Sequence, residues 1–322
     1  MSRRFFSPES FWNQPIGPNP AVDPSSDRWI GILAAEQNPT FWINLDHWTI
    51  PVYEVDERTP KRQVAPYRMK HWAERGGHGA SFEQPVPIPD HAVPDPRQDS
   101  HIALVDYGRR KVWDMFFAHK HEDGSWDSFT GMTYALDGEG IFRDSEFPVK
   151  EGESIHLYGP GRAAGVPIVA GLAMRDEVAS GRIEHRLAFA TGCNSYQQYV
   201  FPATWTDGFT VGGLPEGCVI QLDPSLDLAQ FKLSPGALAM ARALQEYGAV
   251  NVDVAGGTVL YAEGLYGQDP RSWKGLLDGG DLRCIDIRHF RVLQTPAVKQ
   301  GGKAHPPERR GTWSSRRRGV QG

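Results

Sequence analysis

Cysteine is scarce in this chain of 322 residues. The three cysteines, Cys193, Cys218 and Cys284, share no Cys-x-x-Cys spacing. Neither a zinc knuckle nor a disulfide framework is therefore expected. One disulfide is compatible with the count, but three small buried thiols are the favoured expectation.

Long apolar runs are also missing. No stretch approaches the roughly 18 to 20 apolar residues needed to span a bilayer, so we predict no membrane span. The first residues, Met-Ser-Arg-Arg-Phe-Phe-Ser-Pro, lack the apolar stretch of a secretion signal. We expect either a protein that stays inside the cell or one whose signal is not part of this sequence.

Several nucleotide-binding and catalytic motifs are absent. The sequence contains no Walker-type loop, dinucleotide fingerprint, Gly-x-Ser-x-Gly elbow or His-Glu-x-x-His pair. The turn Gly159-Pro-Gly-Arg162 is only weak evidence for an anion site. We predict no cofactor.

The net charge of −5 is unevenly distributed. Residues 303–322 hold six Lys and Arg against one Glu, so residues 1–302 carry a charge of about −10. An acidic body disfavours nucleic acid as a partner, because binding a phosphate backbone requires clustered basic residues. We predict one β-rich domain over residues 1–302 and a basic disordered tail over 303–322.

The residue pattern indicates a fold built mainly from strands. Residues 101–107 and 110–121 predict a hairpin around a Gly108-Arg-Arg turn. Further strands are expected near 154–158, 182–191, 199–203, 217–222, 250–254 and 258–262. The fold class is therefore mainly β: an antiparallel β-sandwich or jelly roll with one or two packed helices.

One helix is well marked. Ser234 is the expected N-cap, Pro235 takes the first helical position and Gly248 ends the helix. Leu238, Ala241, Leu244 and Tyr247 lie on its predicted apolar face. Shorter helices are expected over 26–33 and 172–179.

Ionisable residues occur in two segments that otherwise predict buried strands. Asp114 alternates with Val112 and Phe116, and His185 alternates with Ile183 and Leu187. Burying an unpaired charge is costly, so such groups are paired or lie at functional sites. Asp114 and His185 are candidate catalytic residues; the alternatives are a structural acceptor and a hydrogen-bonded core histidine.

The stretch 193–208 combines aromatic rings with amides. Such rings stack on sugar faces, and amides hydrogen-bond hydroxyl groups. This composition predicts Tyr196 and Tyr199 as catalytic candidates, and as substrate-binding residues it predicts Asn194, Gln197, Gln198, Trp205 and Arg186. The alternative is a structural loop whose aromatic rings pack against the rest of the protein.

A set of short motifs supports a family resemblance. They are Phe5-Phe-Ser-Pro-Glu-Ser-Phe-Trp-Asn13, Val112-Trp-Asp-Met-Phe116, Gly181-Arg-Ile-Glu-His185, Pro215-Glu-Gly217, Leu222-Asp-Pro-Ser-Leu-Asp-Leu228 and Ala243-Leu-Gln-Glu-Tyr-Gly248. Together they resemble a family of mostly secreted bacterial proteins common in actinomycetes, over most of residues 5–263. The resemblance implies one domain and an extracellular setting, and it supplies no catalytic residues.

The leading hypothesis is a carbohydrate-active enzyme that binds a polysaccharide or oligosaccharide in a cleft on the sheet. As a lyase, it would use His185 or a nearby Tyr as base, Arg186 or Gln197 to neutralise a uronate carboxylate, and Tyr196 or Tyr199 as acid. As a glycoside hydrolase, it would pair Asp114 with Glu184 or Asp207.

Two other classes remain open. A non-catalytic carbohydrate-binding or structural module would need the aromatic rings but neither His185 nor Asp114. A metal-dependent small-molecule enzyme would use His101, His119 and His121. We predict no metal site, because the His119-x-His121 pair lies at the solvent end of its strand and a turn follows.

Overall fold

The computed structural model describes residues 4–36, 38–67, 82, 85–143 and 160–302. The strand expected near 154–158 and the tail 303–322 lie outside these residues. Within them the fold is mainly β, as predicted, with three α-helices. The helices are α1 (Ser26–Ala34), α2 (Arg175–Ser180) and α3 (Pro235–Glu246), with short 3-10 turns at Phe11–Asn13, Leu228–Phe231 and Ile287–His289.

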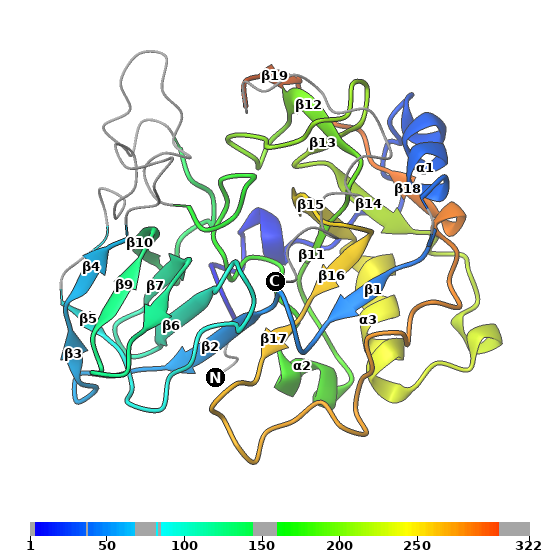
Figure 1. Cartoon of the computed structure of the whole chain (residues 1–322). Coiled ribbons are helices and arrows are strands. Elements are labelled where there is room, and N and C mark those ends of the chain that lie inside the picture. The colour runs from blue at the N-terminus through cyan, green and yellow to red at the C-terminus, as the bar shows by residue number, and fades with distance from the viewer. Residues whose placement is uncertain (1–3, 37, 68–81, 83–84, 144–159, 303–322) are drawn as a thin grey trace, which may run out of the picture.

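The strands form two main sheets (Figure 1). The five-stranded sheet has the order β10 (Thr130–Ala135), β7 (Lys111–Phe116), β6 (Ile102–Asp106), β2 (Ile50–Glu54) and β17 (Glu263–Gly264). The six-stranded sheet has the order β1 (Trp42–Asn44), β16 (Val259–Tyr261), β11 (Leu187–Ala190), β15 (Ala249–Asp253), β14 (Val219–Leu222) and β18 (Phe290–Val292).

Three small sheets complete the architecture. One joins β13 (Leu214–Glu216), β12 (Asn194–Tyr199) and β19 (Lys299–Gln300). The others join β3 (Lys61–Arg62) with β5 (Val86–Pro87), and β4 (Val64–Pro66) with β9 (Trp126–Ser128) and β8 (His119–Lys120).

Strand direction is mixed. The predicted hairpin is present as the antiparallel pair β6 and β7. However, β11 pairs parallel with β15, and β2 pairs parallel with β6. The sheets therefore contain parallel pairs beside the predicted antiparallel ones, because long connections that carry no local turn signal bring these parallel partners together.

The segment 160–174 links the two main sheets. Ala164 N donates to Val252 O of β15 at 3.1 Å, and Ala188 N of β11 donates to Gly171 O at 2.8 Å. Ile168 N donates to the carboxylate of Asp114 on β7 at 3.2 Å. An apolar core that includes Val112, Ile168 and Val252 surrounds these bonds, so the polar groups in this layer are shielded from water.

The marked helix forms as predicted. The Ser234 hydroxyl accepts a hydrogen bond from Ala237 N, and Gly248 has φ 76°, which glycine tolerates without strain. Met240 and Leu244 are fully buried against the six-stranded sheet, whereas Leu238 is half-buried. Ala241 and Tyr247 are buried too, so the predicted face is confirmed except at Leu238.

Two of the three cysteines are buried. All are free thiols; Cys193 and Cys218 lie inside, whereas Cys284 is exposed, so the expectation of three buried thiols is wrong for Cys284. Among the described residues, no helix has both the length and the apolar character needed to cross a bilayer.

Candidate functional site

A fully buried arginine lies between the two main sheets. The Arg162 guanidinium carbon is 3.8 Å from the centre of the Tyr261 ring, and Nη2 donates to Ile168 O at 3.3 Å. Within the described chain, Nε and Nη1 have no hydrogen-bond partner. Because an uncompensated buried charge is costly, this cation favours negative charge on the groups around it.

Asp114 is one of those groups. Its Oδ2 accepts the bond from Ile168 N, and burial raises the pKa of the carboxyl to about 7 although Arg162 acts in the opposite direction. Tyr134 lies on the same face of the sheet, one strand away on β10. Burial and the Asp114 charge raise the pKa of Tyr134 well above its usual value. Asp114 is therefore poised to exchange a proton near neutral pH.

His101 is held in a neutral form nearby. Burial and the charge of Arg162 lower its pKa to about 4. Its Nε2 lies 3.1 Å from Gly161 O, and its ring packs 5.3 Å from that of Phe116. Since a neutral imidazole donates to a carbonyl from one nitrogen, His101 fixes the turn that carries Arg162.

Three further carboxyl groups influence one another's ionisation, and the Arg162 charge acts on one of them, Asp253. Glu216 ends β13, Asp253 ends β15, and Asp207 lies in the loop 200–213. Burial and the charges of Asp207 and Asp253 raise the pKa of Glu216 well above its usual range. Burial and Asp207 do the same for Asp253, against the opposing effect of Arg162. Like charges at close range cannot all ionise, so this cluster retains a proton.

Solvent access differs among the three carboxyl groups. Glu216 is fully buried, whereas Asp207 and Asp253 are half-buried. Asp99, whose charge also raises the pKa of Asp253, is half-buried too. Of the three residues, Asp207 and Asp253 are thus the more exposed, although Asp207 Oδ1 is itself shielded from solvent.

Two buried amides hold the cluster in place. Asn194 Nδ2 donates to Glu216 Oε1 at 2.8 Å and to Asp253 O at 2.6 Å. Asn251 Nδ2 in turn donates to Asn194 Oδ1 at 2.8 Å. Asn194 was predicted to bind substrate; the structure instead places its side chain, fully buried, against the carboxyl groups. Because its side chain is fully buried, Asn194 cannot touch a substrate, and this prediction is wrong.

The predicted aromatic stretch adjoins the same cluster. It forms β12 and the start of the loop 200–213, not a single loop. Thr206 Oγ1 donates to Ser195 O at 3.3 Å, which places the Asp207 segment next to β12. The remaining predicted residues of the stretch are half-buried: Tyr196, Gln197, Gln198, Tyr199 and Trp205.

His185 has partners at both ring nitrogens. It precedes β11, whereas a strand over 182–191 was expected. Nδ1 lies 2.8 Å from Arg186 O, and Nε2 lies 3.1 Å from Glu177 Oε2. Burial alone would lower the pKa of His185, but the Glu177 carboxylate outweighs it and the net pKa is raised. These contacts are those of a hydrogen-bonded core histidine, the alternative considered above.

The predicted acid–base pair of Asp114 and Glu184 does not form. Glu184 is half-exposed and forms ion pairs with Arg4 at 3.1 Å and Arg182 at 3.6 Å, whereas Asp114 is fully buried. Arg186, predicted to neutralise a substrate carboxylate, lines a pocket that includes none of the three carboxyl groups.

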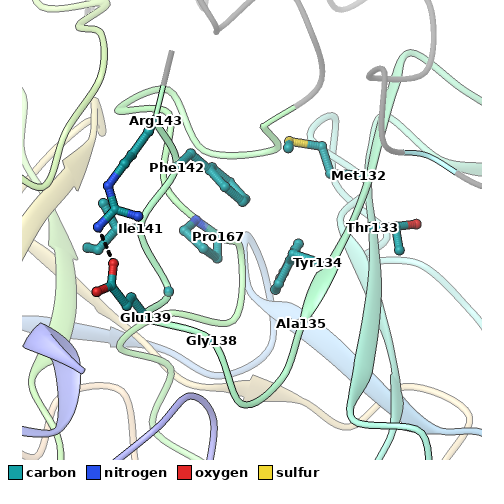
Figure 2. Close-up of a pocket in the computed structure, with 11 residues that line it drawn as sticks. Met132, Thr133, Tyr134, Ala135, Gly138, Glu139, Ile141, Phe142, Arg143 and Pro167 are labelled. Atoms are coloured by element: carbon teal, nitrogen blue, oxygen red, sulfur yellow. Dashed lines mark hydrogen bonds and ion pairs between the residues drawn. The ribbon is translucent and has the colours of Figure 1, made fainter. Parts of the chain in front are cut away.

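A cavity of about 390 Å³ opens above Tyr134 (Figure 2). Tyr134, Phe142 and Pro167 face into it, and the Glu139–Arg143 ion pair lies at its edge, whereas Thr133 points away. The Tyr134 and Phe142 rings meet edge to face with centroids 5.5 Å apart. Asp114 does not line this cavity, but Tyr134, which does, lies on the neighbouring strand and on the same face of the sheet.

The histidine pair shares one carboxylate. His119 Nδ1 and His121 Nε2 each lie 2.9 Å from an oxygen of Asp127. His101 is engaged with Gly161 instead, and no group of three metal-ligating side chains is present among the described residues. The three histidines of the metal hypothesis are therefore not brought together.

No family model, curated protein or solved structure matches this chain. The family resemblance consequently stays a prediction, and the functional argument depends on the site itself.

Most residues of the cluster were not predicted from the sequence. Asp207 was proposed, but Glu216, Asp253 and Tyr261 were not. A local signal existed: in Val250-Asn-Val-Asp-Val254, two polar residues alternate with buried valines, as Asp114 alternates with its apolar neighbours. Arg162 was noted only as part of a turn.

Proposed function

We propose that this protein is a carbohydrate-active enzyme that cleaves a glycosidic bond by hydrolysis, with Asp207 and Asp253 as its acid–base pair. The observation that carries the proposal is the raised pKa of Asp253, caused by burial and by the neighbouring Asp207 charge. Glycoside hydrolysis needs one protonated and one ionised carboxyl group at neutral pH.

The two carboxyl groups take different roles in this scheme. Asp253 holds the proton and donates it to the leaving oxygen, while the Asp207 carboxylate activates water or stabilises the developing positive charge on the sugar ring. The Asp253 backbone is fixed by Asn194, and its Oδ1 accepts from Val254 N at 2.9 Å. This support limits side-chain motion in the reacting geometry.

Glu216 and Arg162 are positioning residues. Burial and the neighbouring charges raise the pKa of the Glu216 carboxyl, and its Oε1 accepts from Asn194, so it keeps Asn194 directed at the Asp253 backbone. The positive charge of Arg162 lowers the pKa of Asp253, but burial and the Asp207 charge raise it by more.

The carbohydrate assignment is supported by the surroundings of the pair. Trp205 lies two residues before Asp207, and Tyr196 and Tyr199 lie on the strand that begins with Asn194. Aromatic rings with adjoining amides are the usual lining of sugar sites. Hydrolysis is preferred to the lyase route because the proposed lyase base, His185, is tied to Glu177.

The test is a screen of neutral and acidic polysaccharides, scored for new reducing ends and for the absorbance of unsaturated products. We expect reducing ends without unsaturation. Asp253→Asn and Asp207→Asn should each lower the rate at least roughly a hundredfold, the usual scale for a general acid or base. The half-exposed Asp137 provides the matched control, and Asp137→Asn should retain full activity.

Two results would overturn the proposal. Unsaturated products would indicate lyase chemistry. Sugar binding with no turnover in the wild type, or full turnover in Asp253→Asn, would indicate that the cluster is not catalytic and favour the binding-module alternative.

A further inference from the structure

A second pocket, of about 180 Å³, lies away from the carboxyl pair. The residues that line it come from five parts of the chain: the 3-10 turn at Phe11–Asn13, the segment before β11, the loop after β12, the β13–β14 turn with the start of β14, and the segment after β18. Its lining includes Phe11, Phe201, Val219, Leu293 and Pro296, which make apolar walls, and the guanidinium of Arg186.

Arg186 is nine-tenths buried in this pocket. Its exposed fraction is 9%, and Nη1 donates to the carbonyl oxygen of Phe11. The guanidinium carbon is 4.3 Å from the centre of the Phe11 ring. Within the described chain, Nε has no hydrogen-bond partner, and no bond from Nη2 is formed either. The Nε–Nη2 edge of the guanidinium therefore makes no hydrogen bond within the described chain.

No acidic side chain compensates this cation. Among the described residues, Arg186 takes part in no ion pair, and burial alone lowers its pKa to about 10. The Asp23 carboxylate behind Thr295 is already bonded to Ser25 N at 2.8 Å and to Thr295 Oγ1 at 2.7 Å. A buried guanidinium without a counter-charge is energetically unfavourable, so an anion from solution would stabilise it.

We propose that the Arg186 pocket binds a small aliphatic carboxylate. The Nε–Nη2 edge of a guanidinium matches the two oxygens of a carboxylate, and the apolar walls match a short hydrocarbon chain. A volume of about 180 Å³ corresponds to about six water-sized groups, since each water occupies roughly 30 Å³. A four-carbon acid such as butyrate has this size.

The experiment compares three probes by calorimetric titration of the full chain. Butyrate should bind with a dissociation constant in the millimolar range, as expected for so few atoms. Butyramide has the same shape but no charge and should bind at least about tenfold more weakly. Inorganic phosphate should also bind more weakly, because it has no hydrocarbon chain to cover the apolar walls.

Variants locate the binding. Arg186→Gln should abolish the preference for butyrate over butyramide, and Phe201→Ala, which removes a wall residue that is 41% exposed, should weaken butyrate binding several-fold. Arg288 is an exposed arginine paired with Asp286, and Arg288→Gln should leave butyrate binding unchanged.

Three outcomes would overturn the proposal: equal affinity for butyrate and butyramide in the wild type, tighter binding of phosphate than of butyrate, or unchanged butyrate binding in both Arg186→Gln and Phe201→Ala. The first two require no variant, so the test stands even if Arg186→Gln fails to fold. Loss of glycosidic activity in Asp253→Asn bears on the other site alone.

Discussion

At the scale of single residues, Asp114 makes the pH dependence of stability testable. Burial raises its pKa to about 7, far above the value of roughly 3.9 in an unfolded chain. Between these two values the native state binds a proton that the unfolded state releases. The free energy of unfolding should therefore fall as pH rises through this window.

Asp114→Asn should remove this contribution. We expect the variant to lose less stability than the wild type between about pH 4 and pH 7, by up to about 4 kcal/mol, since each unit of pKa shift corresponds to 1.36 kcal/mol. Urea unfolding at several pH values measures the difference. If the free energy of unfolding changes with pH in the same way in both proteins, the pKa of Asp114 is not raised in the folded state and the prediction is wrong.

At the scale of elements, the turn from β13 to β14 joins the two proposed sites. Gly217 follows Glu216 and has φ 91°, and a Cβ atom there would lie 1.8 Å from Val200 O. Gly217→Ala should therefore destabilise the protein by at least about 2 kcal/mol, from backbone strain and the displaced strand. Thermal unfolding measures this cost.

Gly257 is the matched control for that variant. A Cβ atom at Gly257 would meet nothing within 4 Å. Gly257→Ala should leave the melting temperature within a few degrees of the wild type. Equal melting temperatures for the two variants would contradict the geometry assigned to the Gly217 turn.

Local signals explain which elements could be predicted. The helix α3 has its N-cap, proline and terminal glycine within fifteen residues of sequence, and the β6–β7 hairpin has its turn between adjacent strands. By contrast, β11 pairs with β15 from about sixty residues away. Nothing in either strand specifies its distant partner, so the mixed sheet order could not be predicted.

At the scale of the whole molecule, the candidate site exists only because distant segments converge. Asp114 could be predicted because its own strand shows a charge among apolar neighbours. The Asp207–Glu216–Asp253 cluster depends on the arrangement of three elements, and each residue alone is an ordinary carboxylate. His185 was singled out by the same local rule as Asp114, but the contact with Glu177 that satisfies it comes from α2 and is not visible in the pattern of its own segment.

The central claim is that these three carboxyl groups titrate as one coupled unit. Carbon-13 NMR titration of the carboxyl groups in the wild type and in Asp207→Asn tests it without a substrate. We predict midpoints for Glu216 and Asp253 well above their usual range in the wild type, and lower midpoints for both when the Asp207 charge is removed. Asp137→Asn should leave both midpoints unchanged. Ordinary midpoints in the wild type, or midpoints that Asp207→Asn does not move, would contradict the account.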